Sequence, residues 1–415
     1  MKQKTLHTPE GVRDIYPLEC RQKLVLQNNL HETLRSYGYH DIQTPTIEFS
    51  EIFSKEAGSL DSKELYRLFD RDGNILVLRP DITPSIARAY STIIEEEATV
   101  TKYCYLGNTF INHSSYQGRL KENTQLGAEM IGLDSVESDT ELLAMVSDVL
   151  EASGLDEYQI TLSHVAYVNA MLSEANLDLE VEKQIRELIE NKNYFGVAEI
   201  LSDCDISENL SRAFAVLPEL IGGVEILEKA KEVAPSEEAL VAIERLERIT
   251  EVLRMYDALS HVTFDLSMSG TYGYYTGIIF RAYTFGTGDA IVKGGRYDKL
   301  LSHFGQNMPA IGFAITVDDL FNALTRQHVE IPCELDNHII IYDDCMQYKA
   351  IRLGRNFRKN GRVTELIKKD PEKDVEFYLS YAKKNFGKFV FYLNEHKMAY
   401  AYNLLDGTIE EADMQ

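Results

Sequence analysis

The sequence predicts an α+β fold in which helices flank a mainly antiparallel sheet. Three observations lead to this prediction. Short runs rich in β-branched and aromatic residues occur as hairpin-like neighbours, which is typical of antiparallel strands. Amphipathic helical patterns separate several of these runs. A block over residues 165–256 then has an almost purely helical pattern, so a helical insertion is expected to interrupt the sheet.

The first helix is predicted over residues 17–38, because apolar residues recur there every three or four positions and Gly38 provides a stop signal. Two further amphipathic helices are expected at Pro84–Glu95 and Asp139–Ala152. The predicted strands of this first part are Asp41–Phe49, Ile75–Leu78, Val100–Phe110, Asn123–Ile131 and Tyr158–Ser163.

The helical block is followed by a return to strands. Its clearest helices by period are Val181–Glu190, Phe195–Leu201, Ile206–Phe214 and Glu237–Tyr256. The strands expected after it are Val262–Leu266, Tyr274–Phe285 and Ala290–Lys293, and a helix is expected at Asp319–Arg326. We therefore predict one domain over residues 1–325, with an insertion at about 175–257.

A small α/β domain is predicted over residues 331–415, opened by Ile331-Pro332. Its expected strands are Ile339–Tyr342, Phe389–Leu393 and Met398–Leu405, and its expected helices are Lys349–Lys359 and Val375–Asn385.

Composition indicates a cytoplasmic globular protein. Of 415 residues, 44% are apolar and 26% charged, which is ordinary for this class. The amino-terminal segment has no apolar run of the signal-peptide kind, and no apolar stretch approaches the roughly 20 residues of a membrane span. The five cysteines have no metal-ligand spacing, so neither zinc nor a disulfide framework is expected. No cofactor is expected either.

The charge is strongly negative and unevenly distributed. The whole chain has 42 basic and 66 acidic residues, a net charge of −24. Residues 331–415 hold 13 basic and 14 acidic ones, which leaves 29 basic and 52 acidic, or −23, in residues 1–330. Because basic side chains that neutralise phosphates dominate affinity for nucleic acid, this balance argues against tRNA as a partner.

Seven motifs occur in an order that resembles the histidyl-tRNA synthetase family. They read T-P-E-G-V-R-D from Thr8, T-P-T-I-E from Thr44, L-R-P-D-I-T-P from Leu78, Q-L-G-A-E-M-I-G from Gln125, Y-Y-T-G from Tyr274, and G-G-R-Y-D from Gly294 with P-A-I-G-F from Pro309. The resemblance implies a class II aminoacyl-tRNA synthetase-like domain, a homodimer core through the segment at Thr44, and a shortened anticodon-binding domain at the carboxyl end. It also implies that the helical insertion is a structural cap over the pocket.

Three positions depart from that family where it places nucleotide-binding residues. Ile111 stands where the family has the arginine that holds the ATP α-phosphate, Gly270 where it has a second arginine, and Asp319, after Asp318, where it has an arginine on adenine. An aliphatic or acidic side chain cannot supply the charged donors that a phosphate needs. This pattern resembles the regulatory subunit of ATP phosphoribosyltransferase. That resemblance implies a non-catalytic chain that activates a short catalytic subunit and reports L-histidine, as effector, to the first step of histidine biosynthesis.

The same resemblance implies a histidine pocket. Asp81, Thr83 and Gln125 match positions that hold the α-ammonium group, and Glu129 and Tyr275 match positions that hydrogen-bond the imidazole. Buried carboxylates are tolerated when such a ligand satisfies them. In the loop before Gln125, Arg119 is a possible contact for a carboxylate or another anion.

Other interpretations of these residues stay open. The polar residues of the predicted pocket are also compatible with a vestigial, water-filled cavity. Tyr274 is interpreted as core, the pair Gly294-Gly295 as close strand packing, and His113 as a solvated loop residue. Two other functions also remain: a histidine sensor or adaptor for another partner, and a working histidyl-tRNA synthetase, which the acidic body argues against.

Overall fold

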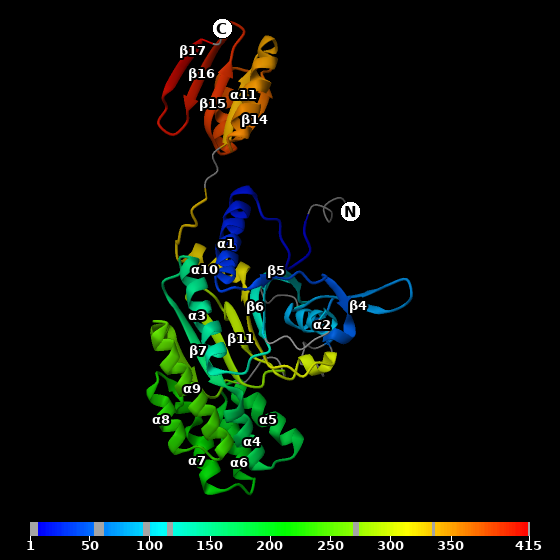
Figure 1. Cartoon of the computed structure of the whole chain (residues 1–415), viewed down its shortest axis with the longest axis vertical. Helices are drawn as coiled ribbons and strands as arrows, with labels where there is room; N and C mark the ends of the chain where they lie inside the picture. The colour runs from blue at the N-terminus through cyan, green and yellow to red at the C-terminus, as the bar shows by residue number, and fades with distance from the viewer. Residues whose placement is uncertain are drawn as a thin grey trace. The chain divides into compact units, whose positions relative to one another are not determined.

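The computed structural model describes residues 7–53, 62–93, 100–113, 119–268, 274–333 and 337–413. The chain divides into two compact units, residues 1–331 and 332–415, and each has its own core (Figure 1). No described helix is long and apolar enough to cross a membrane.

A nine-stranded sheet organises the first unit, with strand order β1-β5-β6-β12-β11-β10-β7-β9-β8 among the described residues. The pairs β1–β5 and β7–β9 are parallel and the other six pairs are antiparallel, so the predicted mainly antiparallel sheet is confirmed. The strands are β1 (His40–Asp41), β5 (Thr101–Phe110), β6 (Glu122–Ile131), β7 (Tyr158–His164), β8 (Ile221–Gly222), β9 (Val262–Asp265), β10 (Ile278–Thr284), β11 (Val292–Arg296) and β12 (Ala310–Thr316).

The predicted strand Asp41–Phe49 is two strands in two sheets. His40–Asp41 joins the large sheet, whereas β2 (Ile47–Phe49) pairs with β4 (Ile75–Leu78) in a three-stranded sheet completed by β3 (Arg67–Phe69). Pro45 lies between them and has no N–H to donate to a strand pairing.

Three helices pack together on one face of the large sheet: α1 (Pro17–Ser36), α3 (Val136–Ala152) and α10 (Val317–Arg326). Strand β6 shows why they do. Its residues Leu126, Ala128 and Met130 are buried in the core on that side, whereas Gln125 and Glu129 alternate to the other face. On that other face, α2 (Thr83–Ile93) packs in a smaller cluster with Tyr297.

The helical insertion is confirmed as helical and contains two helices that the sequence pattern did not single out, α4 and α8. Its members are α4 (Val165–Ala175), α5 (Leu179–Glu190), α6 (Tyr194–Ser202), α7 (Glu208–Val216), α8 (Glu225–Glu232) and α9 (Glu237–Met255). Helix α9 attaches the bundle to the sheet domain, because it packs on both α3 and β7.

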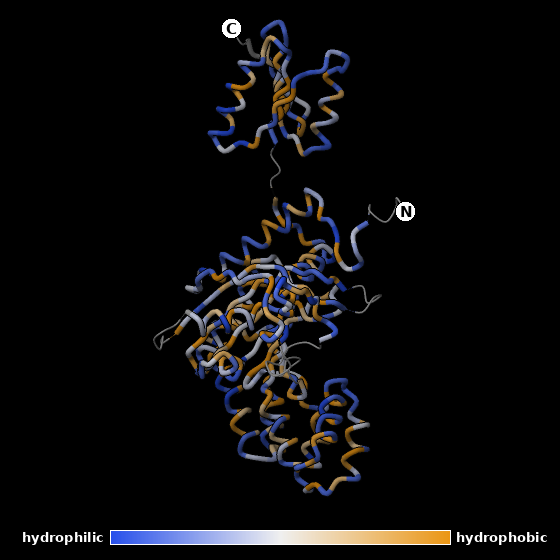
Figure 2. Tube along the Cα trace, turned by 90° about the vertical axis from the view of Figure 1, so that its right-hand side faces the viewer, coloured by the Kyte–Doolittle hydropathy of each residue, from blue (hydrophilic) through white to orange (hydrophobic). Residues whose placement is uncertain are grey.

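The second unit is a five-stranded mixed sheet with order β14-β13-β15-β16-β17, flanked by α11 (Gln347–Lys359) and α12 (Val375–Lys384). Its strands are β13 (Asn337–Tyr342), β14 (Val363–Lys368), β15 (Gly387–Leu393), β16 (Met398–Asn403) and β17 (Ile409–Asp413). Figure 2 shows apolar residues concentrated along the central strands, where Ile339, Ile341 and Val390 are buried.

Candidate amino-acid-binding site

A cavity of about 850 Å³ opens on the sheet face that carries α2. Its walls come from β6, β10, β11 and β12, from α10, from the start of α2 and the end of β5, and from residues 111–113, 119–120 and 286–290. Four of the five predicted histidine-binding residues line it: Asp81, Thr83, Gln125 and Tyr275. Segments distant in sequence, at the start of α2, on β6 and before β10, thus bring these four side chains to one cavity.

Asp81 and Gln125 form one polar corner of the cavity. Asp81 lies just before α2, where its Oδ1 accepts a hydrogen bond from Ile82 N at 2.7 Å and from Gln125 Nε2 at 3.2 Å. Gln125 Oε1 accepts in turn from Ile82 N at 3.2 Å. Burial raises the pKa of Asp81, and these hydrogen bonds oppose the shift. A bound ammonium group would stabilise the ionised carboxylate here.

Glu129 lies behind the cavity wall and is not among its lining residues. It is fully buried, and it accepts hydrogen bonds from Thr83 Oγ1 at 2.6 Å and from the Tyr297 hydroxyl. The space for its carboxylate depends on Gly312, because a Cβ there would lie 1.6 Å from Glu129 Oε2. Burial raises the pKa of Glu129 to about 8, which its hydrogen bonds with Thr83 and Tyr297 partly oppose. Thr83 and Tyr297, which line the cavity, therefore lie between the Glu129 carboxylate and any ligand there.

Three tyrosines form an aromatic wall beside this corner. Tyr274 is buried, as interpreted from the sequence, and packs with Tyr275 and Tyr297 at ring-centroid distances of 4.9 and 5.8 Å. Its hydroxyl also lies 3.4 Å from Asp81 Oδ2, so its role is more than packing. Gly295 allows the Tyr275 ring to approach, since a Cβ there would lie 2.8 Å from the ring. This contact agrees with the close-packing interpretation of Gly294-Gly295.

The other end of the cavity contains two of the three positions that depart from the synthetase pattern. Ile111 follows β5 directly and lines the cavity, as does the half-buried Asp319. Asp318 does not line it, because its carboxylate binds Lys23 Nζ at 2.5 Å and Thr124 N at 2.7 Å. Gly270 lies outside the described residues.

Charges of both signs occur at this end. Lys293 Nζ pairs with Asp289 at 3.0 Å, and the exposed Arg119, the possible anion contact, also lines the cavity. The expectation that His113 is simply solvated is wrong, because it is half-buried and lines the cavity. Burial, followed by the nearby Arg119, lowers the pKa of His113. The cavity lining thus combines basic side chains, Arg281 and Arg326 included, with acidic ones such as Asp319.

The expected cap over the pocket is wrong. None of the described residues that line the cavity comes from the helical block 165–256. The reason is topological: α9 packs against α3 and β7, so the bundle extends from a different part of the sheet from β6 and β12, which form the cavity floor.

Sequence reasoning missed Tyr297 and Lys293 as cavity residues. Lys293 directly precedes the motif G-G-R-Y-D and Tyr297 is its fourth residue, so the motif could have indicated both as cavity residues. Alternation along β11 places Lys293 and Gly295 on the cavity face and Arg296 on the opposite face, where Asp139 binds it. The missing signal was the register that sets Gly295 beside Gly312, and Gly312 beside Glu129.

Comparisons with known proteins agree with this geometry. The Histidyl-tRNA synthetase family profile matches residues 11–320. The protein named ATP phosphoribosyltransferase regulatory subunit from Ruminiclostridium cellulolyticum is 34% identical, over 99% of this chain and 98% of its own. Its namesake from Caldanaerobacter subterraneus is 36% identical, over 87% and 94%.

Solved structures show the same relationship. A crystal structure described as an ATP phosphoribosyltransferase regulatory subunit/histidyl-tRNA synthetase from Bacillus halodurans superposes with a TM-score of 0.83 at 30% identity, over 94% of this chain and 98% of the other. Histidyl-tRNA synthetase from Nostoc shares the fold, with a TM-score of 0.79 at 19% identity, over 98% and 96%. The chain therefore belongs to the family of ATP phosphoribosyltransferase regulatory subunits, built on the class II histidyl-tRNA synthetase fold.

Proposed function

We propose that this chain binds and activates a short catalytic subunit of ATP phosphoribosyltransferase, and that L-histidine in the cavity reports feedback to that subunit. The observation that carries the proposal is the contrast within one cavity. Asp81 and Gln125 remain as partners for an α-ammonium group, whereas Ile111 and Asp319 stand at the nucleotide end.

In the proposed complex, the histidine ammonium group lies at Asp81, Gln125 and Thr83, and the imidazole lies against Tyr275. Glu129 acts from behind the wall: a small rotation of the Thr83 hydroxyl or of Tyr297 frees one of its oxygens for an imidazole N–H. Arg119, which lines the cavity, is the residue that we assign to the ligand carboxylate. Each polar group of histidine then has a partner of opposite charge or a hydrogen-bonding partner.

The proposed regulation is thermodynamic linkage between two sites. Histidine shifts the complex toward a less active state only by the difference in its affinity for the two states. Substitutions in the cavity should therefore change the histidine concentration that inhibits, while activation by subunit binding stays intact.

The test measures phosphoribosyl transfer by the catalytic subunit with and without this chain, and then titrates histidine. Asp81→Asn removes the charge that holds the ammonium group and nearly keeps the side-chain shape. It should raise the inhibitory histidine concentration at least about tenfold, because a charge-assisted hydrogen bond contributes about 1.5–3 kcal/mol. Asp156→Asn, at an exposed residue outside the cavity lining, is the matched control.

Activation and histidine feedback can be disproved independently of each other. If the unmodified chain does not raise the turnover of the catalytic subunit, it is not the activator. If activation occurs but Asp81→Asn is inhibited like the control, histidine acts elsewhere.

The proposal includes loss of aminoacylation. Without an arginine at position 111 and with a carboxylate at 319, the chain should give no histidine-dependent ATP–pyrophosphate exchange. Histidyl-adenylate formed at an ordinary synthetase rate would contradict this. The negative body also predicts no tRNA binding near physiological salt in a filter-binding assay.

We also propose a homodimer formed through the three-stranded sheet β2-β4-β3. Strand pairing places Ile47, Phe49 and Leu68 on one face of this sheet, where they are 49%, 53% and 40% exposed. Apolar side chains grouped on one small sheet favour burial against a second copy. Light scattering should give twice the chain mass, and Phe49→Lys should shift the mass toward the monomer.

A further inference from the structure

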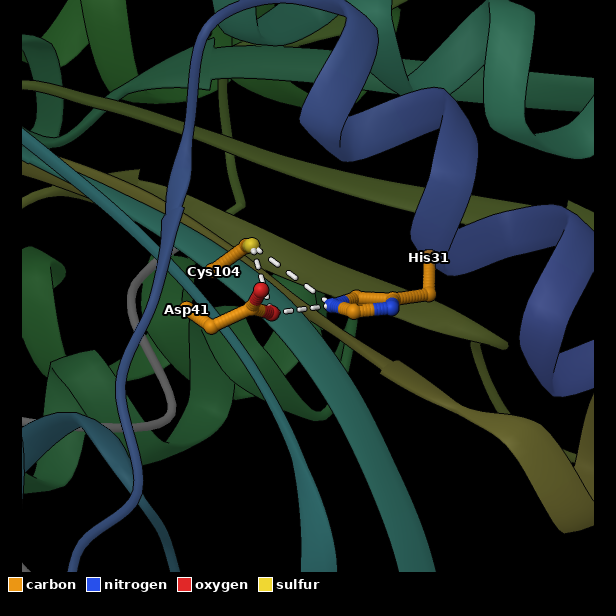
Figure 3. Close-up of side chains that lie close together, drawn as sticks. All are labelled: His31, Asp41 and Cys104. Atoms are coloured by element: carbon orange, nitrogen blue, oxygen red, sulfur yellow. Dashed lines mark hydrogen bonds and ion pairs between the residues drawn. The ribbon is translucent and has the colours of Figure 1, made fainter.

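Three potential metal-binding side chains meet at the edge of the large sheet, away from the cavity. They are His31 of α1, Asp41 of the edge strand β1, and Cys104 of β5. Figure 3 shows the three pointing toward one another. Asp41 and Cys104 are direct partners in the parallel β1–β5 register. Helix α1 packs on β5 and brings His31 to the same place.

The donor atoms are close enough to share one ion. His31 Nε2 lies 2.5 Å from Asp41 Oδ1, and Cys104 Sγ lies 3.8 Å from that nitrogen and 3.7 Å from that oxygen. Tetrahedral zinc with bonds of about 2.0–2.3 Å separates its ligand atoms by roughly 3.3–3.6 Å. Two of the three separations are within a few tenths of an ångström of this range. The third needs the Asp41 carboxylate to withdraw by less than about 1 Å, and its side chain is 59% exposed.

The surroundings of these three side chains favour metal coordination over two alternatives, a catalytic triad and simple packing. A Cys-His-Asp catalytic triad needs the thiol and the carboxylate on different ring nitrogens, but here both approach Nε2. Packing alone does not explain the geometry either, because Cys104 is fully buried yet its sulfur faces two polar atoms. Arg35 Nε lies 3.7 Å from the other Asp41 oxygen, Oδ2, and can hold the carboxylate with Oδ1 toward the cluster. Such outer contacts orient metal ligands.

We propose that His31 Nε2, Asp41 Oδ1 and Cys104 Sγ bind one zinc ion, with water as the fourth ligand on the exposed side. On binding, the sulfur–metal bond replaces the thiol S–H bond, and the proton leaves to solvent. The proton of the His31–Asp41 hydrogen bond leaves Nε2 for solvent or for Nδ1, and two bonds to the metal replace that hydrogen bond. The ion links the carboxyl-terminal half of α1 to the edge strand of the sheet, so it stabilises the fold at this edge. The site is separate from histidine sensing, because none of the three residues lines the cavity.

The test uses the full chain, stripped of metal with a chelator and dialysed, then titrated with Zn²⁺ or Co²⁺ alone. We expect one Zn²⁺ per chain by elemental analysis, and a thiolate-to-cobalt charge-transfer band with Co²⁺. Cys104→Ser should abolish the band. Since Cys104 is buried and its substitution can unfold the chain, His31→Gln and Asp41→Asn test the same site at more exposed positions. Each should weaken Zn²⁺ binding more than about tenfold.

The control is His40→Gln, which changes the exposed neighbour of Asp41 on the opposite face of β1 and should leave Zn²⁺ affinity unchanged. A second readout is thermal unfolding: Zn²⁺ should raise the melting temperature of the unmodified chain and of His40→Gln, but not of His31→Gln. Absence of stoichiometric Zn²⁺ uptake would overturn the proposal. So would a charge-transfer band that survives Cys104→Ser, or unchanged affinity in both His31→Gln and Asp41→Asn.

Discussion

Residues beside the cavity show how the fold accommodates a buried carboxylate, that of Glu129. Glu129 has no contact with solvent, and its oxygens accept hydrogen bonds from Thr83 and Tyr297. Gly312 provides the space beside it. Burial favours the neutral acid, so the pKa of Glu129 rises to about 8. Near neutral pH, burial therefore favours the protonated form of Glu129.

The raised pKa of Glu129 predicts a pH dependence of stability. Its folded pKa of about 8 exceeds the ordinary value of 4.5, so between these values the folded chain keeps a proton that the unfolded chain releases. The contribution is fully present below pH 4.5 and is lost as pH rises through 8. The free energy of unfolding should fall by up to about 1.4 kcal/mol per pH unit from this group. Glu129→Gln should remove that part of the slope in urea unfolding between pH 5.5 and 8.

The control for this prediction is Glu199→Gln, at an exposed position in α6. Its pH profile should follow that of the unmodified chain, because this exposed side chain does not line the cavity. Parallel profiles for Glu129→Gln and the unmodified chain would show that Glu129 ionises normally.

At the scale of elements, a buried ion network joins three parts of the fold. Asp139, in the first turn of α3, pairs with Arg296 of β11 at 2.6 Å and with Arg245 of α9 at 2.7 Å. Arg296 also donates to Ser138 Oγ at 2.9 Å and to Leu133 O at 3.1 Å. The network therefore connects the sheet, the helix behind it and the insertion.

This network predicts an order of destabilisation. Asp139→Asn removes the charge that both arginines share, and the buried Arg296 loses its main partner, so unfolding should become easier by about 3–5 kcal/mol. Arg245→Gln should cost about 1–2 kcal/mol, because its side chain is partly solvated and Asp139 keeps Arg296. Chemical denaturation of the two variants gives both values. A larger loss for Arg245→Gln would contradict the central role of Asp139.

At the scale of the whole molecule, the chain consists of an acidic body and a nearly neutral small unit. Residues 1–331 contain the nine-stranded sheet, the insertion and the cavity, and residues 332–415 contain a five-stranded sheet with a separate core. All described residues that line the cavity come from the first unit. We therefore expect the proposed histidine sensing not to require the second unit.

This separation predicts that residues 1–331 fold alone. A chain ending at Ile331 should bind L-histidine with an affinity within about twofold of the full chain in calorimetry. Its urea midpoint should match the main transition of the full chain, since effects at distant sites are close to additive. Loss of histidine binding in a folded 1–331 fragment would show that the second unit completes the site.

Periodicity predicted most elements of this fold because their apolar faces are continuous in sequence. Residues 17–38 and 237–256 show the helical period, and α1 and α9 are found there. Strands β3, β8, β12, β14 and β17 were not predicted. In β12 the run Ala310–Phe313 is apolar on both faces and contains Gly312. Such a strand lacks the alternation that identifies a half-exposed one.

For the candidate site, the sequence by itself determined which residue types are present: carboxylates and amides at the amino-acid positions, and no arginine at Ile111 or Asp319. Only the tertiary structure decided that Glu129 is sealed behind Thr83 and Tyr297, that the insertion does not cover the cavity, and that His31, Asp41 and Cys104 meet. The physical reason is that strand register and helix packing set these distances. Both depend on contacts between residues far apart in the chain, which local patterns do not encode.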